Sequence, residues 1–226
     1  IRRIFSSYVS PKIVEQLVSH PEMAKLGGQR KEVTLLFSDI RGFTSFSEKR
    51  SPEEVVAMLN EYFEIMAGIV FHWDGTLDKF IGDAILAFWG APLDQPDHAE
   101  RAVRCALHMS DDLRKLQEKW RAEGKEVMDC GIGINTGEVL IGNIGSQGKK
   151  MDYTVIGDHV NLGSRVQGLT KKYATRILIT EFTYAKIRPI AEAGLIGHLD
   201  MLEADTVTVR GKEVPVNVYA LSSDPH

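Results

Sequence analysis

The segment that decides the fold comprises residues 76–89, which read TLDKFIGDAILAFW. Two runs of apolar, β-branched and aromatic residues, Thr76 to Phe80 and Ala84 to Trp89, flank Ile81-Gly82-Asp83. This pattern predicts a β-hairpin, because glycine in a short connection is free to adopt a positive φ. The hairpin would carry Asp83 at its tip.

A strand and a helix are expected before the hairpin, and a second helix after it. Val33 to Phe37 is an apolar run short enough for a buried strand, and it stops at Ser38-Asp39. Ser51 to Glu54 combines a serine N-cap, a proline at the first helical position and a glutamate three residues after the cap. Apolar residues at helical spacing then continue to Val70, and a second such pattern covers residues 97–120.

Short strands follow these helices. They are expected at residues 127–134, 139–144, 153–156 and 177–180, with a hairpin formed by 206–209 and 214–219, and a helix is expected to begin near Asp158. The order strand, helix, hairpin, helix, strand is the ferredoxin-like βαββαβ arrangement. We therefore predict an α+β fold in which an antiparallel sheet has helices packed on one face, with C-terminal additions.

The composition excludes several classes of protein. The 226 residues include 27 Lys and Arg against 31 Asp and Glu, a net charge of −4, which gives no basic field for a nucleic-acid partner. The longest apolar runs, such as residues 65–71, fall short of the about 20 residues that span a bilayer, so no membrane contact is expected. Cys105 and Cys130 form neither a CxxC pair nor a disulfide-rich pattern and are interpreted as buried apolar residues.

Residues 1–30 differ from the rest of the chain. Ser10-Pro11 precedes apolar residues at 13, 14, 17 and 18, and Gly27-Gly28 follows them, which predicts a short amphipathic helix and a joint. We interpret residues 1–30 as a linker from an upstream regulatory region, and residues 31–222 as one domain. The first residue, Ile1, suggests a fragment of a longer chain.

Two acidic residues are the candidates for a metal site. Asp39 ends the first strand and Asp83 lies at the hairpin tip, and these elements are neighbours at the centre of a ferredoxin-like sheet. Two adjacent carboxylates suit Mg²⁺, which keeps waters and substrate phosphates in its other positions. The alternative is that each aspartate only stabilises a turn, and spacing alone leaves this choice open.

Other candidates are cations and amides that suit a phosphate group. Asn161 and Arg165 are four residues apart on the helix expected near Asp158, so both would project from one face. Arginine offers a planar charged fork to phosphate, although a solvated helix face is the alternative. Lys212 in the last hairpin is either a phosphate anchor or an exposed turn cation. The GxGxxG motif fails at Thr136, and the P-loop motif fails at Asn143 and Lys150.

Three longer motifs resemble those of the class III adenylate and guanylate cyclase catalytic domain. They are Phe37-Ser38-Asp39-Ile40-Arg41-Gly42-Phe43-Thr44, Lys79-Phe80-Ile81-Gly82-Asp83, and residues 153–165, which read YTVIGDHVNLGSR. The resemblance runs in order from about residue 31 to 220. It implies that residues 31–222 are the catalytic domain of such a cyclase, which lies in the cytoplasm.

The resemblance also implies roles for individual residues. Asp39 and Asp83, with the carbonyl of Ile40, would bind two Mg²⁺ or Mn²⁺ ions. Arg165 would stabilise charge on the α-phosphate, Asn161 would orient the ribose, and Lys212 would contact the terminal phosphates. In this family the metal aspartates of one site belong to one subunit, and the base-selecting lysine, the asparagine and the arginine belong to the other. A head-to-tail homodimer with two composite sites is therefore expected.

The base would be read by Lys79 and Thr154. Lys79 only donates, which suits N1 of adenine, and nothing acidic is expected there to bind guanine. The family usually has Asp at position 154, whereas the threonine hydroxyl here can accept or donate, so its contact is less decisive. ATP is the expected substrate. The combination of Lys79 and Thr154 resembles the cyanobacterial and animal soluble cyclases that respond to bicarbonate.

The predicted function is an adenylate cyclase that forms cyclic AMP and pyrophosphate from ATP. Two alternatives stay open: a guanylate cyclase, which shares the metal and phosphate apparatus, and a catalytically silent nucleotide-binding dimerisation module. Asp39, Asp83, Asn161 and Arg165 are all present, which favours an active enzyme.

Overall fold

The fold is built on one large sheet. A computed structural model describes residues 6, 8–23, 28–146, 150–202, 205–209 and 212–223. The eight-stranded sheet has the order β2-β3-β1-β4-β6-β10-β7, and β5 pairs with β4 beside this row. Its strands are β1 (Gln29–Arg41), β2 (Thr76–Ile81), β3 (Ala84–Trp89), β4 (Asp129–Ser146), β5 (Lys150–Ile156), β6 (Ile177–Thr180), β7 (His198–Met201) and β10 (Val218–Ser222).

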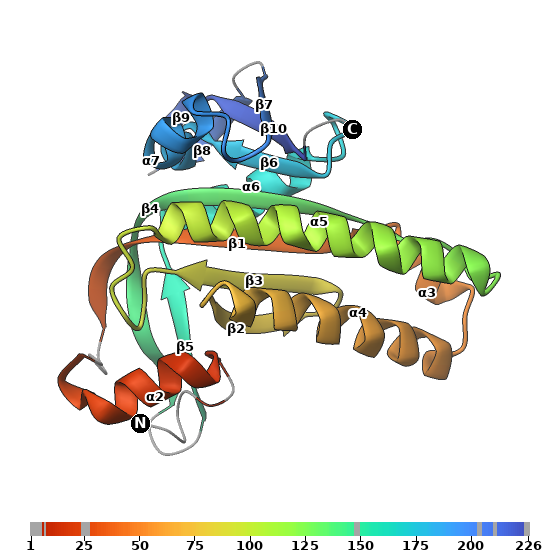
Figure 1. The fold of residues 1–226 in the computed structure, drawn as a ribbon, viewed down its shortest axis with the longest axis horizontal. Coiled ribbons are helices and arrows are strands. Elements are labelled where there is room, and N and C mark those ends of the chain that lie inside the picture. Colours follow the sequence, from red (N-terminus) through yellow and green to blue (C-terminus); the bar gives the residue numbers. More distant parts are fainter. Residues whose placement is uncertain are drawn as a thin grey trace.

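The predicted βαββαβ core is confirmed. It consists of β1, helix α4 (Pro52–His72), the β2–β3 hairpin, helix α5 (His98–Ala122) and β4. Figure 1 shows α4 and α5 side by side across one face of this sheet. Buried residues of both helices, including Tyr62, Met66 and Met109, form a single cluster with Leu36 and Ile134 of the sheet. The main core therefore lies between this helix pair and the central strands.

The local signals for the core elements are also confirmed. Helix α4 begins with a capping box, in which Ser51 accepts from the N–H of Glu54 and Glu54 accepts from the N–H of Ser51. Gly82, in the turn of the β2–β3 hairpin, has a φ of 59°. Both cysteines are buried, and burial raises the pKa of the Cys130 thiol to about 12, which fits an apolar core position.

The prediction of two strands between residues 127 and 144 is wrong. β4 runs without interruption from Asp129 to Ser146, through Asn135-Thr136-Gly137, where a turn was expected. The polar side chains here are buried and paired: Thr136 contacts Thr34, and Asn135 accepts from Thr180. Buried polar groups that find partners within the sheet do not require a turn.

Two helices cover the opposite face of the sheet, beyond the expected single layer. Helix α6 (Asp158–Leu169) packs there because the sheet carries glycines beneath it. A Cβ on Gly133 would lie 2.3 Å from the backbone nitrogen of Gln167. Helix α2 (Pro11–Ser19) buries Ile13, Val14 and Leu17 against the same face. The amphipathic helix predicted within residues 1–30 thus exists, and its apolar side packs against the domain.

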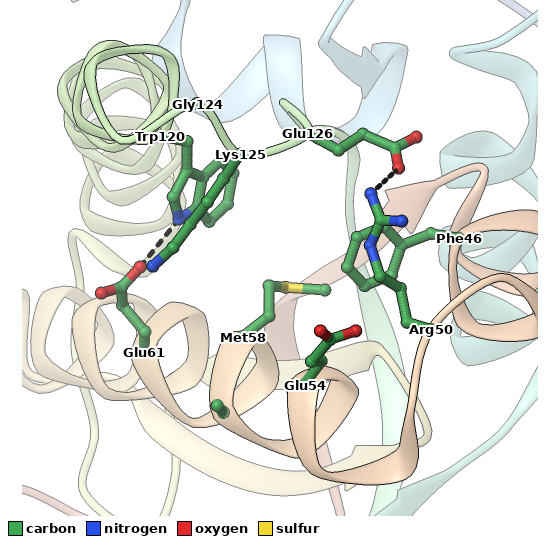
Figure 2. Close-up of a pocket in the computed structure, with 10 residues that line it drawn as sticks. Phe46, Arg50, Glu54, Met58, Glu61, Trp120, Gly124, Lys125 and Glu126 are labelled. Atoms are coloured by element: carbon green, nitrogen blue, oxygen red, sulfur yellow. Dashed lines mark hydrogen bonds and ion pairs between the residues drawn. The ribbon is translucent and has the colours of Figure 1, made fainter.

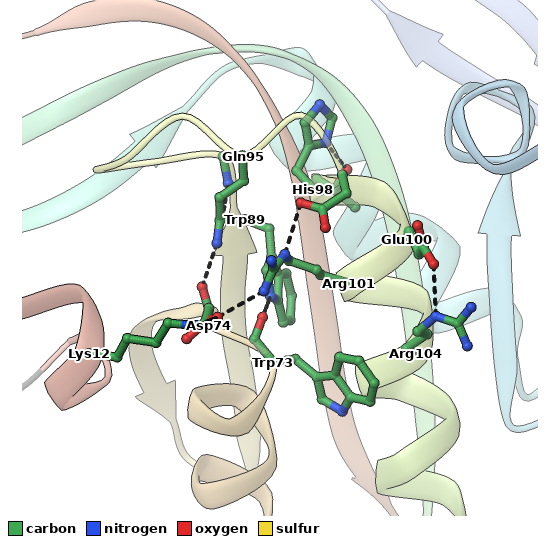
Figure 3. Close-up of polar contacts among 12 residues, drawn as sticks. Lys12, Trp73, Asp74, Trp89, Gln95, His98, Glu100, Arg101 and Arg104 are labelled. Atoms are coloured by element: carbon green, nitrogen blue, oxygen red, sulfur yellow. Dashed lines mark hydrogen bonds and ion pairs between the residues drawn. The ribbon is translucent and has the colours of Figure 1, made fainter. Parts of the chain in front are cut away.

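A polar network joins α2 to the core. Asp74, which follows α4, accepts hydrogen bonds from Ser10 and Lys12 at 3.4 Å and from Arg101 of α5 at 2.8 Å. Figure 3 shows Lys12 and Arg101 approaching Asp74 from opposite sides. The carbonyl of Tyr8 also accepts from the N–H of Leu77 at 2.7 Å, so the N-terminal segment contacts strand β2 directly.

The C-terminal additions extend the sheet. β6 is parallel to β4, β10 and β7 pair antiparallel at its outer side, and helix α7 (Glu181–Glu192) follows β6. The expected hairpin forms a separate two-stranded sheet of β8 (Asp205–Val209) and β9 (Lys212–Val216), but residues 218 and 219 belong to β10. Two short helices, the 3₁₀ turn Pro21–Met23 and α3 (Phe43–Glu48), were not predicted.

Helix α4 is the one helix in the described part of the chain that is long and apolar enough to cross a membrane. Its residues Tyr62, Met66, Ile69 and Val70 are buried in the core cluster with α5 and the sheet. A core helix passes the same test of length and composition.

Candidate active site

The two candidate metal ligands meet at the centre of the sheet. Asp39 lies near the end of β1, and Asp83 lies in the turn between β2 and β3. Pairing of β1 with β3 sets Ser38 opposite Ile85, and Asp83 Oδ2 accepts from the N–H of Ile40 at 2.9 Å. Burial, followed by the nearby charge of Asp83, raises the pKa of the Asp39 carboxyl. The structure therefore brings this predicted pair together.

Gln167 is a further member of this cluster that sequence reasoning missed. Its Nε2 donates to Asp39 Oδ1 at 2.5 Å and to the carbonyl of Gly131 at 3.3 Å. These bonds fix the direction of the Asp39 side chain from the buried side of α6. The available signal was helical periodicity, because Gln167 is four residues after Gly163 and shares its face.

This cluster fits divalent metal ions. Asp39 and Asp83 supply carboxylate oxygens, and the Ile40 backbone runs between them. Mg²⁺ takes oxygen ligands and is commonly held by one or two carboxylates plus substrate phosphates. Among the described residues no group of three or more His, Cys, Asp or Glu could hold a metal. Waters and substrate phosphates are the further ligands that a site of this kind would take.

The expected base-reading residues form a second cluster. Lys79 of β2 and Thr154 of β5 lie on either side of Asp78. Thr154 Oγ1 donates to Asp78 Oδ2 at 2.6 Å, and Lys79 Nζ is 3.7 Å from Asp78 Oδ1. The Lys79 side chain keeps 38% of its surface exposed, whereas that of Asp78 is 0% exposed. Two predicted residues thus approach the same carboxylate, Asp78.

An acidic residue, Asp78, lies beside Lys79, but it is not accessible to a bound guanine. The β2–β3 pairing is irregular between Leu77 and Lys79, and the Asp78 side chain is buried there. Burial raises the pKa of Asp78, and the Thr154 hydroxyl and the Lys79 charge oppose that shift. Because Asp78 is fully covered, a bound base could reach Lys79 and Thr154 but not this carboxylate.

Asn161 and Arg165 form a third group, on the outer side of α6. Both are exposed, and at 100° per residue they are about 40° apart around the helix. Arg165 is about 160° away from Gln167, whose side chain contacts Asp39. Within one chain, α6 therefore directs Asn161 and Arg165 away from the carboxylate pair. Lys212 begins β9, and its side chain lies outside the described residues.

A separate cavity lies next to α3, at one end of the layer formed by α4 and α5. It has a volume of about 480 Å³ and is lined by residues of α3 and the turn after it, of α4, and of the end of α5 and the segment after it. Figure 2 shows Arg50 paired with Glu126 on one side and Glu61 paired with Trp120 on the other. None of the predicted site residues lines this cavity.

Comparison with known proteins identifies the family. The sequence model described as "Adenylate and Guanylate cyclase catalytic domain" matches residues 27–223. The chain belongs to this family. The resemblance found in the three motifs is therefore confirmed, and the chain is a nucleotide cyclase domain.

Relatives of this cyclase domain include both substrate classes. "Adenylate cyclase 1" of Rhizobium meliloti is 35% identical over 215 residues, which are 95% of this chain and 31% of that protein. The crystal structure of the adenylyl cyclase CyaB from P. aeruginosa has a TM-score of 0.76 at 35% identity and covers 89% of this chain and 98% of that chain. The guanylyl cyclase Cya2 has a TM-score of 0.74 at 39% identity and covers 89% and 96%. The chain spans about a third of the length of the Rhizobium protein.

Proposed function

We propose that this cyclase domain converts ATP to 3′,5′-cyclic AMP and pyrophosphate. The observation that carries the choice of base is the pair Lys79 and Thr154, which are partly exposed and approach the two oxygens of Asp78. Adenine presents an acceptor at N1 and a donor at its 6-amino group, whereas guanine presents the reverse. The Lys79 ammonium only donates, so it suits adenine N1.

The carboxylate cluster supports the chemistry. Two Mg²⁺ or Mn²⁺ ions at Asp39, Asp83 and the Ile40 carbonyl would activate the ribose 3′-hydroxyl and neutralise the triphosphate. The new bond joins the 3′-oxygen to the α-phosphorus, the bond to the β-phosphate breaks, and the hydroxyl proton is released. Gln167 holds Asp39 in a fixed direction for this task.

The α6 side chains suit the triphosphate and the ribose. Arg165 offers a permanently charged planar fork to the α-phosphate, where negative charge increases as the substrate reacts. Asn161, one helical turn earlier on the same exposed face, would orient the ribose. We assign Lys212 to the terminal phosphates on the family resemblance.

The geometry of α6 favours a composite site in a homodimer. Because Asn161 and Arg165 project away from the carboxylate pair of their own chain, they suit the metal cluster of a second copy. An exposed apolar pair supports such a contact: Leu140 and Ile156 lie opposite each other on β4 and β5 and are 42% and 50% exposed. Each site would then combine Asp39 and Asp83 of one chain with Arg165 of the other.

The test is production of cyclic AMP from ATP by the purified domain with Mg²⁺ or Mn²⁺. Asp39→Asn should lower the rate by about 100-fold or more, because a neutral amide is a poor ligand for a hard cation. Asp200→Asn is the matched control, since it removes one exposed carboxylate from β7 and should keep the rate. Binding of ATP without turnover in the parent domain would instead indicate a silent nucleotide-binding module.

Guanylate cyclase activity is the second candidate, favoured by the 39% identity to the guanylyl cyclase Cya2. The two candidates are separated by kcat/KM for ATP and for GTP under the same metal conditions. We expect the value for ATP to be higher. A higher value for GTP would overturn the assignment of the base to Lys79 and Thr154.

A response to bicarbonate is proposed on the resemblance of the Lys79 and Thr154 pair to cyclases that respond to this ion. Adding bicarbonate at constant pH and ionic strength should raise the rate of cyclic AMP formation. An unchanged rate would remove this part of the proposal. The use of ATP also supports the cytoplasm as the place where the domain works.

A further inference from the structure

Asp78 is a buried carboxylate that the proposed chemistry does not use. Its side chain is 0% exposed, yet it lies between the two residues expected to read the base. One oxygen, Oδ2, accepts from Thr154 at 2.6 Å, and the other, Oδ1, has no hydrogen-bond partner in the described structure. Burying a carboxylate is costly, so an interior aspartate at this place calls for an explanation.

The hydrogen bond from Thr154 has a fixed direction. An ionised carboxylate has no proton and only accepts, so the single proton of the Thr154 hydroxyl lies between Oγ1 and Asp78 Oδ2. Oγ1 then has only lone pairs left for further hydrogen bonds. Toward a bound base, Thr154 therefore presents an acceptor.

The same carboxylate acts on Lys79. Lys79 Nζ is 3.7 Å from Asp78 Oδ1, so the negative charge of Asp78 attracts the ammonium group of Lys79. The cluster as a whole then presents a donor at Lys79 and an acceptor at Thr154. The donor at Lys79 matches the acceptor N1 of adenine, and the acceptor at Thr154 matches its 6-amino group. With guanine, two donors would meet at N1–H and two acceptors would meet at O6.

We infer that Asp78 is a positioning residue that sets the base specificity of the site by holding the Thr154 hydroxyl as an acceptor. The inference rests on the proposed cyclase function and refines it. Asp78 removes the ambiguity of a hydroxyl group, which by itself can accept from adenine or donate to guanine. A buried carboxylate behind Thr154 thus performs part of the task of an aspartate at position 154.

The decisive variant is Asp78→Asn, which keeps the shape of the side chain and removes the obligatory acceptor. The ratio of kcat/KM for ATP to kcat/KM for GTP should fall about tenfold, mainly because the freed Thr154 hydroxyl can donate to guanine O6. A role in stability alone would lower both values together and leave the ratio unchanged. An unchanged ratio would therefore overturn the inference.

Asp152→Asn is the matched control. Asp152 lies on β5 and its charge acts on Asp78, so this variant removes a neighbouring carboxylate without altering the acceptor that holds Thr154. The ratio should stay within about twofold of the parent value. If Asp152→Asn shifted the ratio as far as Asp78→Asn, a general effect of charge would replace the proposed role.

A second variant keeps Asp78 and covers the case in which Asp78→Asn does not fold. In Thr154→Asn, Asp78 should bind the amide nitrogen and leave the amide oxygen as an acceptor for adenine. The ratio of kcat/KM for ATP to kcat/KM for GTP should stay within about threefold of the parent value. An amide that Asp78 did not orient could turn its oxygen toward adenine or its nitrogen toward guanine, and the ratio would fall. Loss of the preference in a folded Thr154→Asn protein would contradict the inference.

Equilibrium binding separates this inference from the proposed function. Titration of each variant with ATP and GTP measures the base preference without turnover. One outcome is that the parent domain binds ATP more tightly than GTP without forming a cyclic nucleotide. If Asp78→Asn then reduces this difference in affinity, the proposed function fails and the inference holds. If cyclic AMP forms and the binding preference is unchanged by Asp78→Asn, only the inference fails.

Discussion

At Gly133 the sheet has no side chain, and helix α6 occupies the space. An alanine Cβ there would lie 2.3 Å from the Gln167 backbone nitrogen, which belongs to the helix and cannot rotate away. Gly133→Ala should therefore lower the free energy of unfolding by about 2–3 kcal/mol and weaken cyclase activity, because Gln167 would lose its position on Asp39. Chemical denaturation and a rate measurement check both effects.

Gly168→Ala provides the control on the same helix. A Cβ at Gly168 would meet no atom within 4 Å, and alanine is the better helix former. This variant should raise the free energy of unfolding by about 0.5–1 kcal/mol. Equal losses at Gly133 and Gly168 would show that close packing under α6 is not the cause.

His98 makes stability depend on pH. Its Nδ1 lies 2.6 Å from Thr34 Oγ1, and burial lowers its pKa below the ordinary 6.5, an effect that Lys186 supports and that Glu32 and Asp97 oppose. Below pH 6.5 the unfolded chain takes up a proton that the folded chain resists, so the folded state loses stability as the pH falls. The loss should occur between 6.5 and the lower folded pKa.

The variant His98→Asn tests this dependence, because an amide can replace Nδ1 toward Thr34 without titrating. The difference in free energy of unfolding between parent and variant should shrink as the pH is lowered from about 7.5 to 5.5. Urea titrations at several pH values measure it. If the free energies of unfolding of parent and variant changed in parallel over this pH range, the role given to His98 would be contradicted.

The residues that sequence reasoning missed depend on contacts between distant segments. Asp39 and Asp83 could be predicted as candidates because each lies close to the end of a recognisable strand. The burial of Asp78 could not be predicted, because it depends on contacts such as that with Thr154 of β5, which is distant in the sequence. Gln167 becomes a partner of Asp39 only when glycines let α6 approach the sheet.

At the scale of elements, α2 is part of the packing of the domain. Leu17 is 0% exposed and lies in one cluster with Leu35 of β1 and Tyr153 of β5, next to Thr154. Leu17→Ala should lower the free energy of unfolding by about 2–4 kcal/mol, because it leaves a cavity beneath β5. The adjacent Val18 is 48% exposed, so Val18→Ala should change the free energy of unfolding by less than about 0.5 kcal/mol.

These two variants distinguish a packed helix from a passive linker, and denaturant titration of both measures the difference. A passive linker would make the two substitutions equally mild. The amphipathic pattern of residues 11–19 was sufficient to predict a helix. It gave no indication of the sheet face on which the helix would pack, since that depends on apolar residues of β1, β3 and β5.

In strand β4, the local sequence pattern predicts a turn that the structure does not contain. Asn135, Thr136 and Gly137 are typical turn residues, yet β1 pairs with β4 from residue 129 to residue 141 without a break. Thr34 and Thr183 contact Thr136 from both sides, and these partners come from other parts of the chain. Tertiary hydrogen bonds outweigh the local preference here.

At the scale of the whole molecule, the site residues form three groups that one chain does not unite. The carboxylates and the Lys79–Thr154 cluster each assemble within the chain, whereas Arg165 points away from Asp39. The sequence could predict which residues are candidates for the site, because the motifs are long and in order. The division into shared sites was expected from the family resemblance alone, because local sequence patterns do not give the rotation of α6 relative to the sheet.

The division leads to a prediction about mixed dimers. Asp39→Ala destroys the metal half of a site and Arg165→Ala destroys the phosphate half, so each variant alone should be inactive. In a mixed dimer, one site combines both defects and the other combines two intact halves. Random mixing of equal amounts makes half of the dimers mixed, so about a quarter of the parent rate should return.

A matched mixture excludes trivial rescue. Asp39→Ala mixed with Asp83→Ala places one defect in the metal half of every site of a mixed dimer, so no activity should return. Cyclic AMP formation is measured for both mixtures after association of the two differently tagged chains has been verified. If associated Asp39→Ala and Arg165→Ala chains stayed inactive, both groups would have to act within one chain, and α6 would have to rotate by roughly half a turn to bring Arg165 to Asp39. The hydrogen bond from Gln167 to Asp39 and the close contact of Gly133 with the helix backbone both oppose such a rotation.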